Sequence, residues 1–126
     1  MATFREMYGP WAIITGASSG IGLNFANQLA ERGLNLVLVA RREDRLRELA
    51  VRLEKSFPIK TKVVVADLSR DDFAADIQPS TDGLDVGLLV NNAGFSNTGE
   101  FLENEVGSEL KMLHVNCRAP LVLAHE

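Results

Sequence analysis

A glycine-rich turn near the amino terminus constrains this chain more than any other feature of its sequence. The segment 15–22 reads Thr-Gly-Ala-Ser-Ser-Gly-Ile-Gly, follows the apolar run 11–14 and leads into a helical pattern that Gly33 ends. Glycine lets the backbone approach a ligand closely, and the first helical turn presents unpaired N–H groups and the positive end of the helix dipole. A strand, a glycine turn and a helix in this order predict a phosphate-binding site. The alternative is a tight turn without a ligand.

Three further apolar runs follow, each separated from the next by a helical pattern. They cover residues 36–40, 63–66 and 86–90 and do not alternate with polar residues, which is typical of strands covered on both faces of a parallel sheet. Strand and helix alternate four times, which indicates βαβ units with right-handed crossovers. The sequence therefore predicts an α/β fold, a parallel sheet of four strands with helices on both faces, within residues 1–126.

The helical patterns predict which residues face the core. In the first helix these are Ile21, Phe25 and Leu29, seconded by Ala26 and Ala30. In the second helix, which Pro58 ends, they are Leu46, Leu49, Ala50 and Leu53. A weak helix is expected around 73–77, ahead of a loop at 79–83, and a last helix is expected to run from Val106 to the end of the chain.

Composition excludes several classes of protein. Of the 126 residues 46% are apolar and 24% charged, which is typical of a globular domain and not of a disordered chain. The single Cys117 cannot form an internal disulfide and makes a poor metal site with His114 and His125, so no metal is expected. The 13 basic and 17 acidic residues are interspersed, which argues against a nucleic-acid partner. Without an apolar run of about 18 residues or a signal-like start, no membrane association is predicted, and the expected location is the cytoplasm.

Four motifs follow one another along the chain: the turn 15–22, Asp67 after the third strand, Asn-Asn-Ala-Gly at 91–94, and Asn116 in the last helix. In this order they resemble the short-chain dehydrogenase/reductase family. Within the family, the arginine pair 41–42 and the run 35–45 look most like the ketoreductases, 3-oxoacyl reductases and hydroxysteroid dehydrogenases. The resemblance implies that residues 1–126 are the N-terminal part of a Rossmann-type NAD(P)-binding domain. Its doubly wound parallel sheet would be incomplete, with strand order 3-2-1-4 for the four strands present. The resemblance also implies a nicotinamide dinucleotide as cofactor and a small-molecule carbonyl or alcohol as substrate.

The same resemblance implies roles for individual residues. The glycine turn would contact the adenosine ribose and the pyrophosphate. Asp67 would bind the adenine amino group, and the backbone of Leu68 would lie beside that group. The segment 91–94 would brace the sheet and line the pocket. The cofactor-binding residues predicted in this way are Gly16, Ser18, Ser19, Gly20, Ile21, Gly22, Asp67, Leu68, Asn92, Ala93 and Gly94. Turn formation alone is the other interpretation of the asparagines.

The residues after the second strand predict which dinucleotide is bound. A carboxylate there would bind a free ribose 2′-hydroxyl and repel a 2′-phosphate. Here Arg41 and Arg42 follow the strand, with no acid before Glu43, and guanidinium groups bind phosphate in a forked geometry. We therefore predict NADP(H) in preference to NAD(H). Two opposing observations are that an arginine pair can simply be solvated, and that Ser19 stands where many NADP-preferring relatives carry a basic residue.

Asn116 and Pro120 form a spacing with a physical consequence. In an α-helix residue 120 would donate its N–H to the carbonyl of residue 116, but proline has no N–H and its ring crowds that carbonyl. In the family this asparagine kinks the helix, and its main-chain carbonyl holds a water in the proton relay. The resemblance thus implies a catalytic role for Asn116, the alternative being an ordinary proline kink.

The remaining catalytic residues of the family are not found in this sequence. A serine and a Tyr-x-x-x-Lys motif would follow a fifth strand, whereas Tyr8 is the only tyrosine and precedes the first strand. We expect the cofactor-binding half of a longer enzyme, inactive alone, and a homo-oligomer formed through the free edge of the fourth strand or exchange of the last helix. The alternatives are a non-catalytic NADP(H)-binding module and a fragment that binds nothing.

Overall fold

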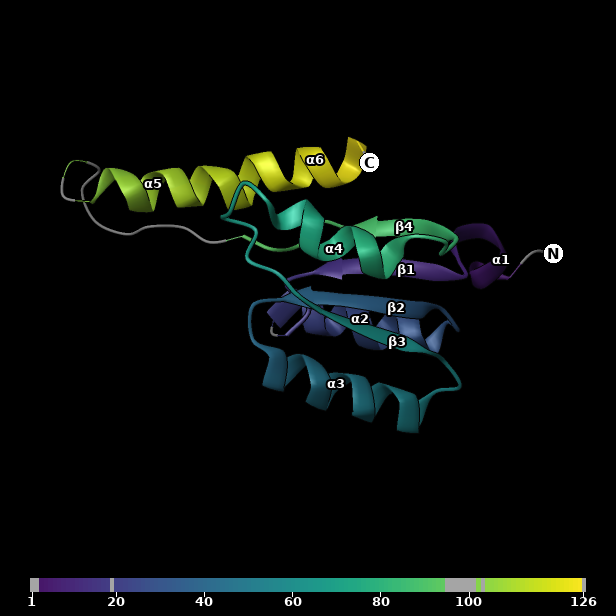
Figure 1. Ribbon diagram of the computed structural model, residues 1–126. Coiled ribbons are helices and arrows are strands. Elements are labelled where there is room, and N and C mark those ends of the chain that lie inside the picture. Colours follow the sequence, from purple (N-terminus) through teal and green to yellow (C-terminus); the bar gives the residue numbers. More distant parts are fainter. Residues whose placement is uncertain (1–2, 19, 95–101, 103, 126) are drawn as a thin grey trace.

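The computed structural model describes residues 3–18, 20–94, 102 and 104–125, which form a four-stranded parallel sheet between two layers of helices (Figure 1). The strands are β1 (Trp11–Thr15), β2 (Asn35–Ala40), β3 (Thr61–Val65) and β4 (Val86–Val90). The helices are α1 (Phe4–Tyr8), α2 (Gly20–Glu31), α3 (Glu43–Ser56), α4 (Phe73–Thr81), α5 (Val106–Leu113), the π-helix η2 (His114–Arg118) and α6 (Ala119–His125).

The strand order is β3-β2-β1-β4, and every pair of neighbours is parallel. The predicted Rossmann-type sheet and its order 3-2-1-4 are therefore confirmed. The chain passes from β1 to β2 on one side and returns past β1 to β4 on the other. This reversal places a crevice at the carboxyl ends of β1 and β4, which is where open α/β sheets bind ligands.

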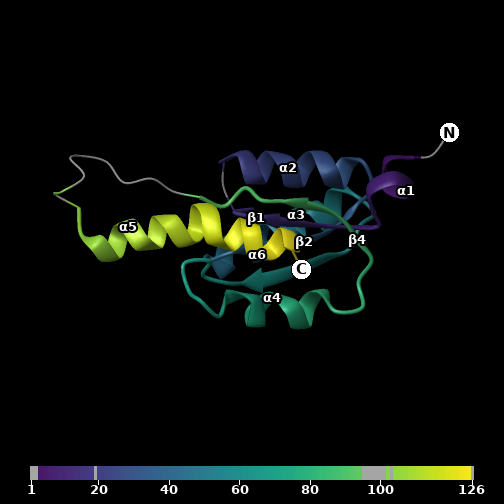
Figure 2. The same ribbon diagram turned by 90° about the horizontal axis from the view of Figure 1, so that it is seen from above.

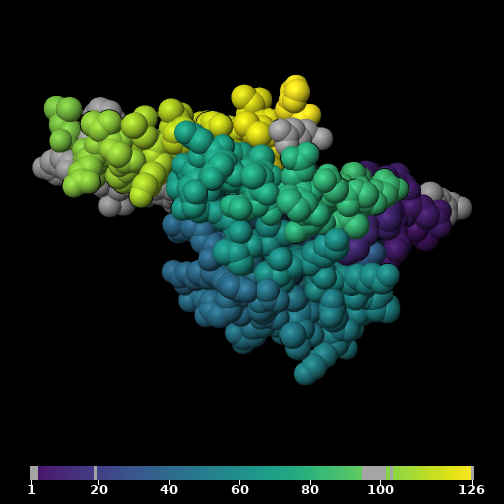
Figure 3. Space-filling view, in the orientation of Figure 1, coloured from purple at the N-terminus to yellow at the C-terminus, as the bar shows by residue number. Residues whose placement is uncertain are grey.

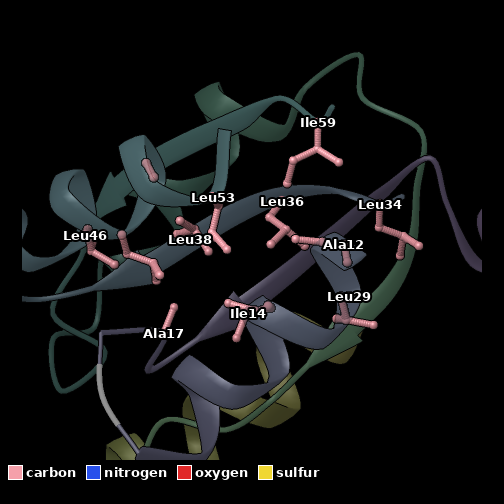
Figure 4. Close-up of a cluster of buried hydrophobic side chains, with 14 residues drawn as sticks. Ala12, Ile14, Ala17, Leu29, Leu34, Leu36, Leu38, Leu46, Leu53 and Ile59 are labelled. Carbon is pink, nitrogen blue, oxygen red and sulfur yellow. The ribbon is translucent and has the colours of Figure 1, made fainter. Parts of the chain in front are cut away.

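Strand β2 lies at the centre of the core, and its side chains alternate between the two faces of the sheet. Leu36 and Leu38 pack with α2 and α3 on one face (Figure 4), whereas Val37 and Val39 pack with α4, η2 and α6 on the other. Residues 35–39 are all buried. The absence of polar alternation in this strand thus follows from burial on both faces. Figure 2 shows the helices on either side of the sheet.

The first helix differs from the prediction in the face that it buries. Ile21 and Phe25 are 67% and 42% exposed, and the buried residues of α2 are Gly22, Ala26, Leu29 and Ala30. Three of these four residues are glycine or alanine, which fits the close approach of Gly22 to the β1 turn. The second helix buries the four residues expected of it.

Three further differences concern the helices at either end and α4. Residues 4–8 form the helix α1, which the sequence analysis did not predict, and its N-cap Thr3 accepts the N–H of Glu6 at 3.2 Å. Helix α4 continues to Thr81 with Pro79 inside it, so the loop predicted at 79–83 begins later. The last helix contains a π-helical segment just before Pro120, where the N–H of Ala119 donates to the carbonyl of His114. The wider turn adjusts the backbone next to a residue that has no N–H.

Candidate functional site: a crevice at the carboxyl ends of the strands

A pocket of about 440 Å³ opens at the carboxyl ends of the four strands. It brings together eight of the predicted site residues, namely Gly16, Ser18, Arg41, Arg42, Asp67, Leu68, Ala93 and Gly94. The other lining residues were not predicted as site residues; they are Val39, Ala40, Arg45, Ala66, Ser69, Lys111 and Val115. Segments that lie far apart in the sequence therefore meet in one crevice, as the parallel sheet requires.

The hydroxyl of Thr15 joins the ends of β1 and β4 beneath this pocket. Its Oγ1 accepts the backbone N–H groups of Asn92 and Ala93, both at 3.0 Å, and donates to the carbonyl of Val90 at 3.4 Å. Thr15 is only 1% exposed, so these bonds form away from water. The threonine thus holds the Asn-Asn-Ala-Gly segment against the glycine turn. Sequence reasoning did not single it out, although a hydroxyl residue between a strand and a glycine turn was a visible signal.

The glycine turn is held from the same segment by a side chain. Nδ2 of Asn92 donates to the carbonyl of Gly16 at 3.2 Å. Gly16 has φ of +66°, and a Cβ there would lie 2.9 Å from Nδ2 of Asn92 and 3.0 Å from Cα of Ala93. Only glycine combines this dihedral angle with so close an approach. Asn92 therefore supports the turn from behind and is not itself among the residues that line the pocket.

Asp67 lies at the carboxyl end of β3 and accepts two hydrogen bonds from Ser69. Its Oδ1 accepts the Oγ–H of Ser69 at 2.6 Å and the Ser69 backbone N–H at 3.0 Å. The hydroxyl bond is the main reason that the pKa of Asp67 lies below its ordinary value. Partial burial opposes the effect, whereas the Ser69 N–H and the charges of Arg41 and Lys111 reinforce it. The carboxylate is thus held ionised at neutral pH.

Ser69→Ala is expected to raise the pKa of Asp67 toward the ordinary 3.8, because the strongest bond to the carboxylate is lost. The folded pKa is the lower one, so these bonds stabilise the fold above the unfolded pKa and are lost as pH falls through the folded value. The variant should therefore be less stable than the parent at pH 7, and the difference should shrink below pH ~4. NMR titration of the carboxyl carbon measures the pKa, with Ser56→Ala as the control. An unchanged pKa in Ser69→Ala would contradict this account.

Cations dominate the charge of the pocket lining. Arg41, Arg42 and Arg45 lie at the end of β2 and the start of α3, Lys111 lies on α5, and Asp67 is the only carboxylate among the lining residues. Glu43, the first acid after β2, is turned along the helix, where its Oε1 lies 2.8 Å from both Nε and an Nη of Arg47. The crevice is therefore suited to an anion, within a chain whose net charge is −4.

The predicted catalytic residue, Asn116, lies in the π-helical segment and outside the pocket lining. A Cβ on Gly94 would lie 3.0 Å from Oδ1 of Asn116, so the two segments are in close contact. Nearby, Nδ2 of Asn91 donates to the carbonyl of Pro120 at 3.3 Å and joins the end of β4 to α6. Single-turn π segments occur often at functional sites.

Not every residue predicted to bind the cofactor lines the pocket. Gly20, with φ of +60°, and Gly22 form the start of α2 and shape the turn from outside, and Ile21 is exposed. Ser19 lies outside the described residues. No three metal-binding side chains converge within the described ranges. Among the described helices, none combines the length and the hydrophobicity needed to cross a membrane.

The chain belongs to the short-chain dehydrogenase family, whose model matches residues 10–126. It is 40% identical over 88 residues to the very-long-chain 3-oxoacyl-CoA reductase of Rattus norvegicus, covering 70% of this chain and 28% of that protein. The family resemblance inferred from the four motifs is thus confirmed, and with it an oxidoreductase lineage.

Two solved structures are similar over nearly the whole chain. One, from a study of 7beta-hydroxysteroid dehydrogenase stereoselectivity, has a TM-score of 0.94 and 34% identity, and the match covers 98% of this chain and 48% of that one. The other is a short-chain dehydrogenase from Sphingobium yanoikuyae in complex with NADPH, with a TM-score of 0.84 and 36% identity over 92% of this chain and 46% of that one. The chain spans less than half the length of these relatives.

Proposed function

We propose that this chain is the NADP(H)-binding half of an oxidoreductase that acts on a small-molecule carbonyl or alcohol. The observation that carries the proposal is the pocket at the carboxyl ends of the strands, with arginines and no carboxylate on its wall at the end of β2. A nicotinamide cofactor would supply hydride transfer when bound. The chain's own residues would bind its adenosine end and hold it in orientation.

The residues present fit such a nucleotide. The β1 turn has no side chain at Gly16, so an anionic group can approach the backbone there. Arg41 and Arg42 would hold a 2′-phosphate in charge-assisted bonds, and the ionised Asp67 would accept the adenine amino group. The similar structure solved with NADPH supports the same choice of cofactor. The cytoplasmic location stays a prediction from composition.

Calorimetric titration of the chain with NADPH, NADH and adenosine 2′,5′-bisphosphate tests the proposal. NADPH and the bisphosphate are expected to bind, and NADH is expected to bind about tenfold or more weakly because it lacks the 2′-phosphate. Binding of all three with equal affinity would overturn the preference for NADP(H). If none of the three binds, the chain is a fragment that does not bind nucleotide, which is the third interpretation of the sequence.

We further propose that the chain alone does not turn over substrate. Its only tyrosine, Tyr8, lies on α1, at the amino end of β1 and at the opposite end of the sheet from α5 (Figure 1). The pocket therefore receives no tyrosine hydroxyl as a general acid, a contribution of about 10²- to 10⁴-fold in rate. A non-catalytic NADP(H)-binding module is the second candidate, and the same absence favours it. A downstream Tyr-x-x-x-Lys in the source reading frame would distinguish the two.

Association with a second copy is the last part of the proposal. Helices α5 and α6 expose large apolar side chains, and three of them recur at i, i+4 and i+7 as a stripe on α5. Figure 3 shows α5 extending beyond the body of the molecule. Val106, Leu110, Leu113 and Leu121 are 74%, 49%, 54% and 71% exposed. Large apolar side chains that gather on an exposed surface mark interaction sites. The free edge of β4, which pairs only with β1 in the described sheet, adds unpaired backbone groups on the same half of the molecule.

Light scattering is expected to give about twice the chain mass of 13.8 kDa at micromolar concentration. Leu113→Glu should reduce the mass to that of one chain, because it places a charge in the stripe. Val51→Glu, at a site equally exposed on α3, should leave the mass unchanged. A wild-type chain that stays monomeric at high micromolar concentration would refute the association.

A further inference from the structure

Arg45 occupies a position that its helical pattern alone does not suggest. It lies in the first turn of α3, three residues after Arg42, which is the N-cap of that helix. The apolar residues of α3 predict only that the side chain of Arg45 points away from the core. In the structure it lines the 440 Å³ pocket together with Arg41 and Arg42.

Among the described residues, no acid forms an ion pair with the guanidinium of Arg45. The ion pairs of the described residues join Arg47 to Glu43, Arg70 to Asp72 and Arg118 to Asp71. Two carboxylates lie beside Arg45 in the sequence. Glu43 is bound to Arg47, and Asp44 is not part of the pocket lining. In the part of the chain that the structure describes, Arg45 therefore lines the pocket without an ion-pair partner.

We propose that Arg45 is a third specificity-determining residue, which binds the adenosine 2′-phosphate together with Arg41 and Arg42. This inference rests on the proposed function, because it concerns the same nucleotide pocket. A phosphate monoester carries a charge of about −1.5 to −2 at pH 7 and three strong acceptor oxygens, more than one guanidinium can satisfy. Three arginines that line the same pocket match that charge and that number of acceptors.

Adenosine 2′,5′-bisphosphate and adenosine 5′-monophosphate provide the test, because they differ only in the 2′-phosphate. In calorimetric titrations of the full chain, Arg45→Ala is expected to weaken binding of the bisphosphate about 3- to 10-fold and to leave binding of the monophosphate within about twofold. Arg45→Lys keeps the positive charge but loses the forked guanidinium geometry. Its affinity for the bisphosphate should therefore lie between those of the wild-type chain and Arg45→Ala. Arg52→Ala, an exposed arginine of the same helix outside the pocket, is the matched control and should change neither affinity.

The outcomes separate this inference from the proposed function. If the wild-type chain prefers the bisphosphate and Arg45→Ala keeps the full preference, Arg45 has no role in specificity and the NADP(H) assignment stands. An equal loss of affinity for the bisphosphate in Arg52→Ala would also overturn the inference, because the effect would then come from the net charge of the chain and not from a contact in the pocket. If the wild-type chain binds both nucleotides equally or binds neither, the proposed cofactor preference fails and the role of Arg45 fails with it.

Discussion

Gly22→Ala is expected to lower the free energy of unfolding by about 3 kcal/mol and to abolish nucleotide binding. A Cβ at this position would meet the carbonyl oxygen of Gly16 and would lie 2.6 Å from Nδ2 of Asn92. Both groups belong to a hydrogen bond of 3.2 Å that holds the glycine turn to the end of β4. Relief of the clash would move backbone and not a flexible side chain, so the turn itself would be displaced. Urea unfolding followed by circular dichroism measures the stability, and NADPH titration measures the binding.

Gly107→Ala is the matched control for this substitution. Gly107 also lies in a helix, α5, but a Cβ there would meet nothing within 4 Å. The control should keep nucleotide binding and gain about 0.5–1 kcal/mol from the higher helix propensity of alanine. Equal stability of the two variants would show that the turn tolerates a side chain at Gly22, and the structural basis proposed for the pocket would then be wrong.

The double variant Arg41→Ala/Arg42→Ala is expected to weaken NADPH binding about 10- to 100-fold and NADH binding no more than about threefold. Both arginines line the pocket, are exposed and take part in no ion pair of the described residues. Arg42 is the N-cap residue of α3 but makes no side-chain capping bond, so its replacement removes no helix cap. The loss should therefore be confined to the interaction with the 2′-phosphate.

Calorimetry with the two dinucleotides checks this result, and Arg52→Ala again provides the control. Unfolding curves should show that the double variant is as stable as the parent, because neither arginine packs in the core. A parallel loss for NADPH and NADH would mean that the arginines act on a part shared by both cofactors. The preference for NADP(H) would then need another source.

Much of the candidate site could be predicted because its signals are local. The glycine turn, Asp67 and the segment 91–94 each follow an apolar run, and the carboxyl ends of parallel strands necessarily meet at one edge of the sheet. Arg45 and Lys111 were not predicted because their place in the pocket depends on how α3 and α5 are positioned against that edge. Thr15 was missed for a related reason, since its donors lie 77 and 78 residues further along the chain.

Local pattern alone specifies the strands and most helices and their succession along the chain, because apolar periodicity and turn residues act over a few positions. It does not specify the rotation of a helix about its own axis. Packing decides that rotation. Helix α2 turns Gly22 and Ala26 toward the sheet, because Gly22 lies directly against Gly16 and Asn92. Ile21 and Phe25 are therefore left in solvent. Tertiary structure also decides the charge of the pocket. Glu43 forms an ion pair with Arg47, whereas Arg45 lines the crevice.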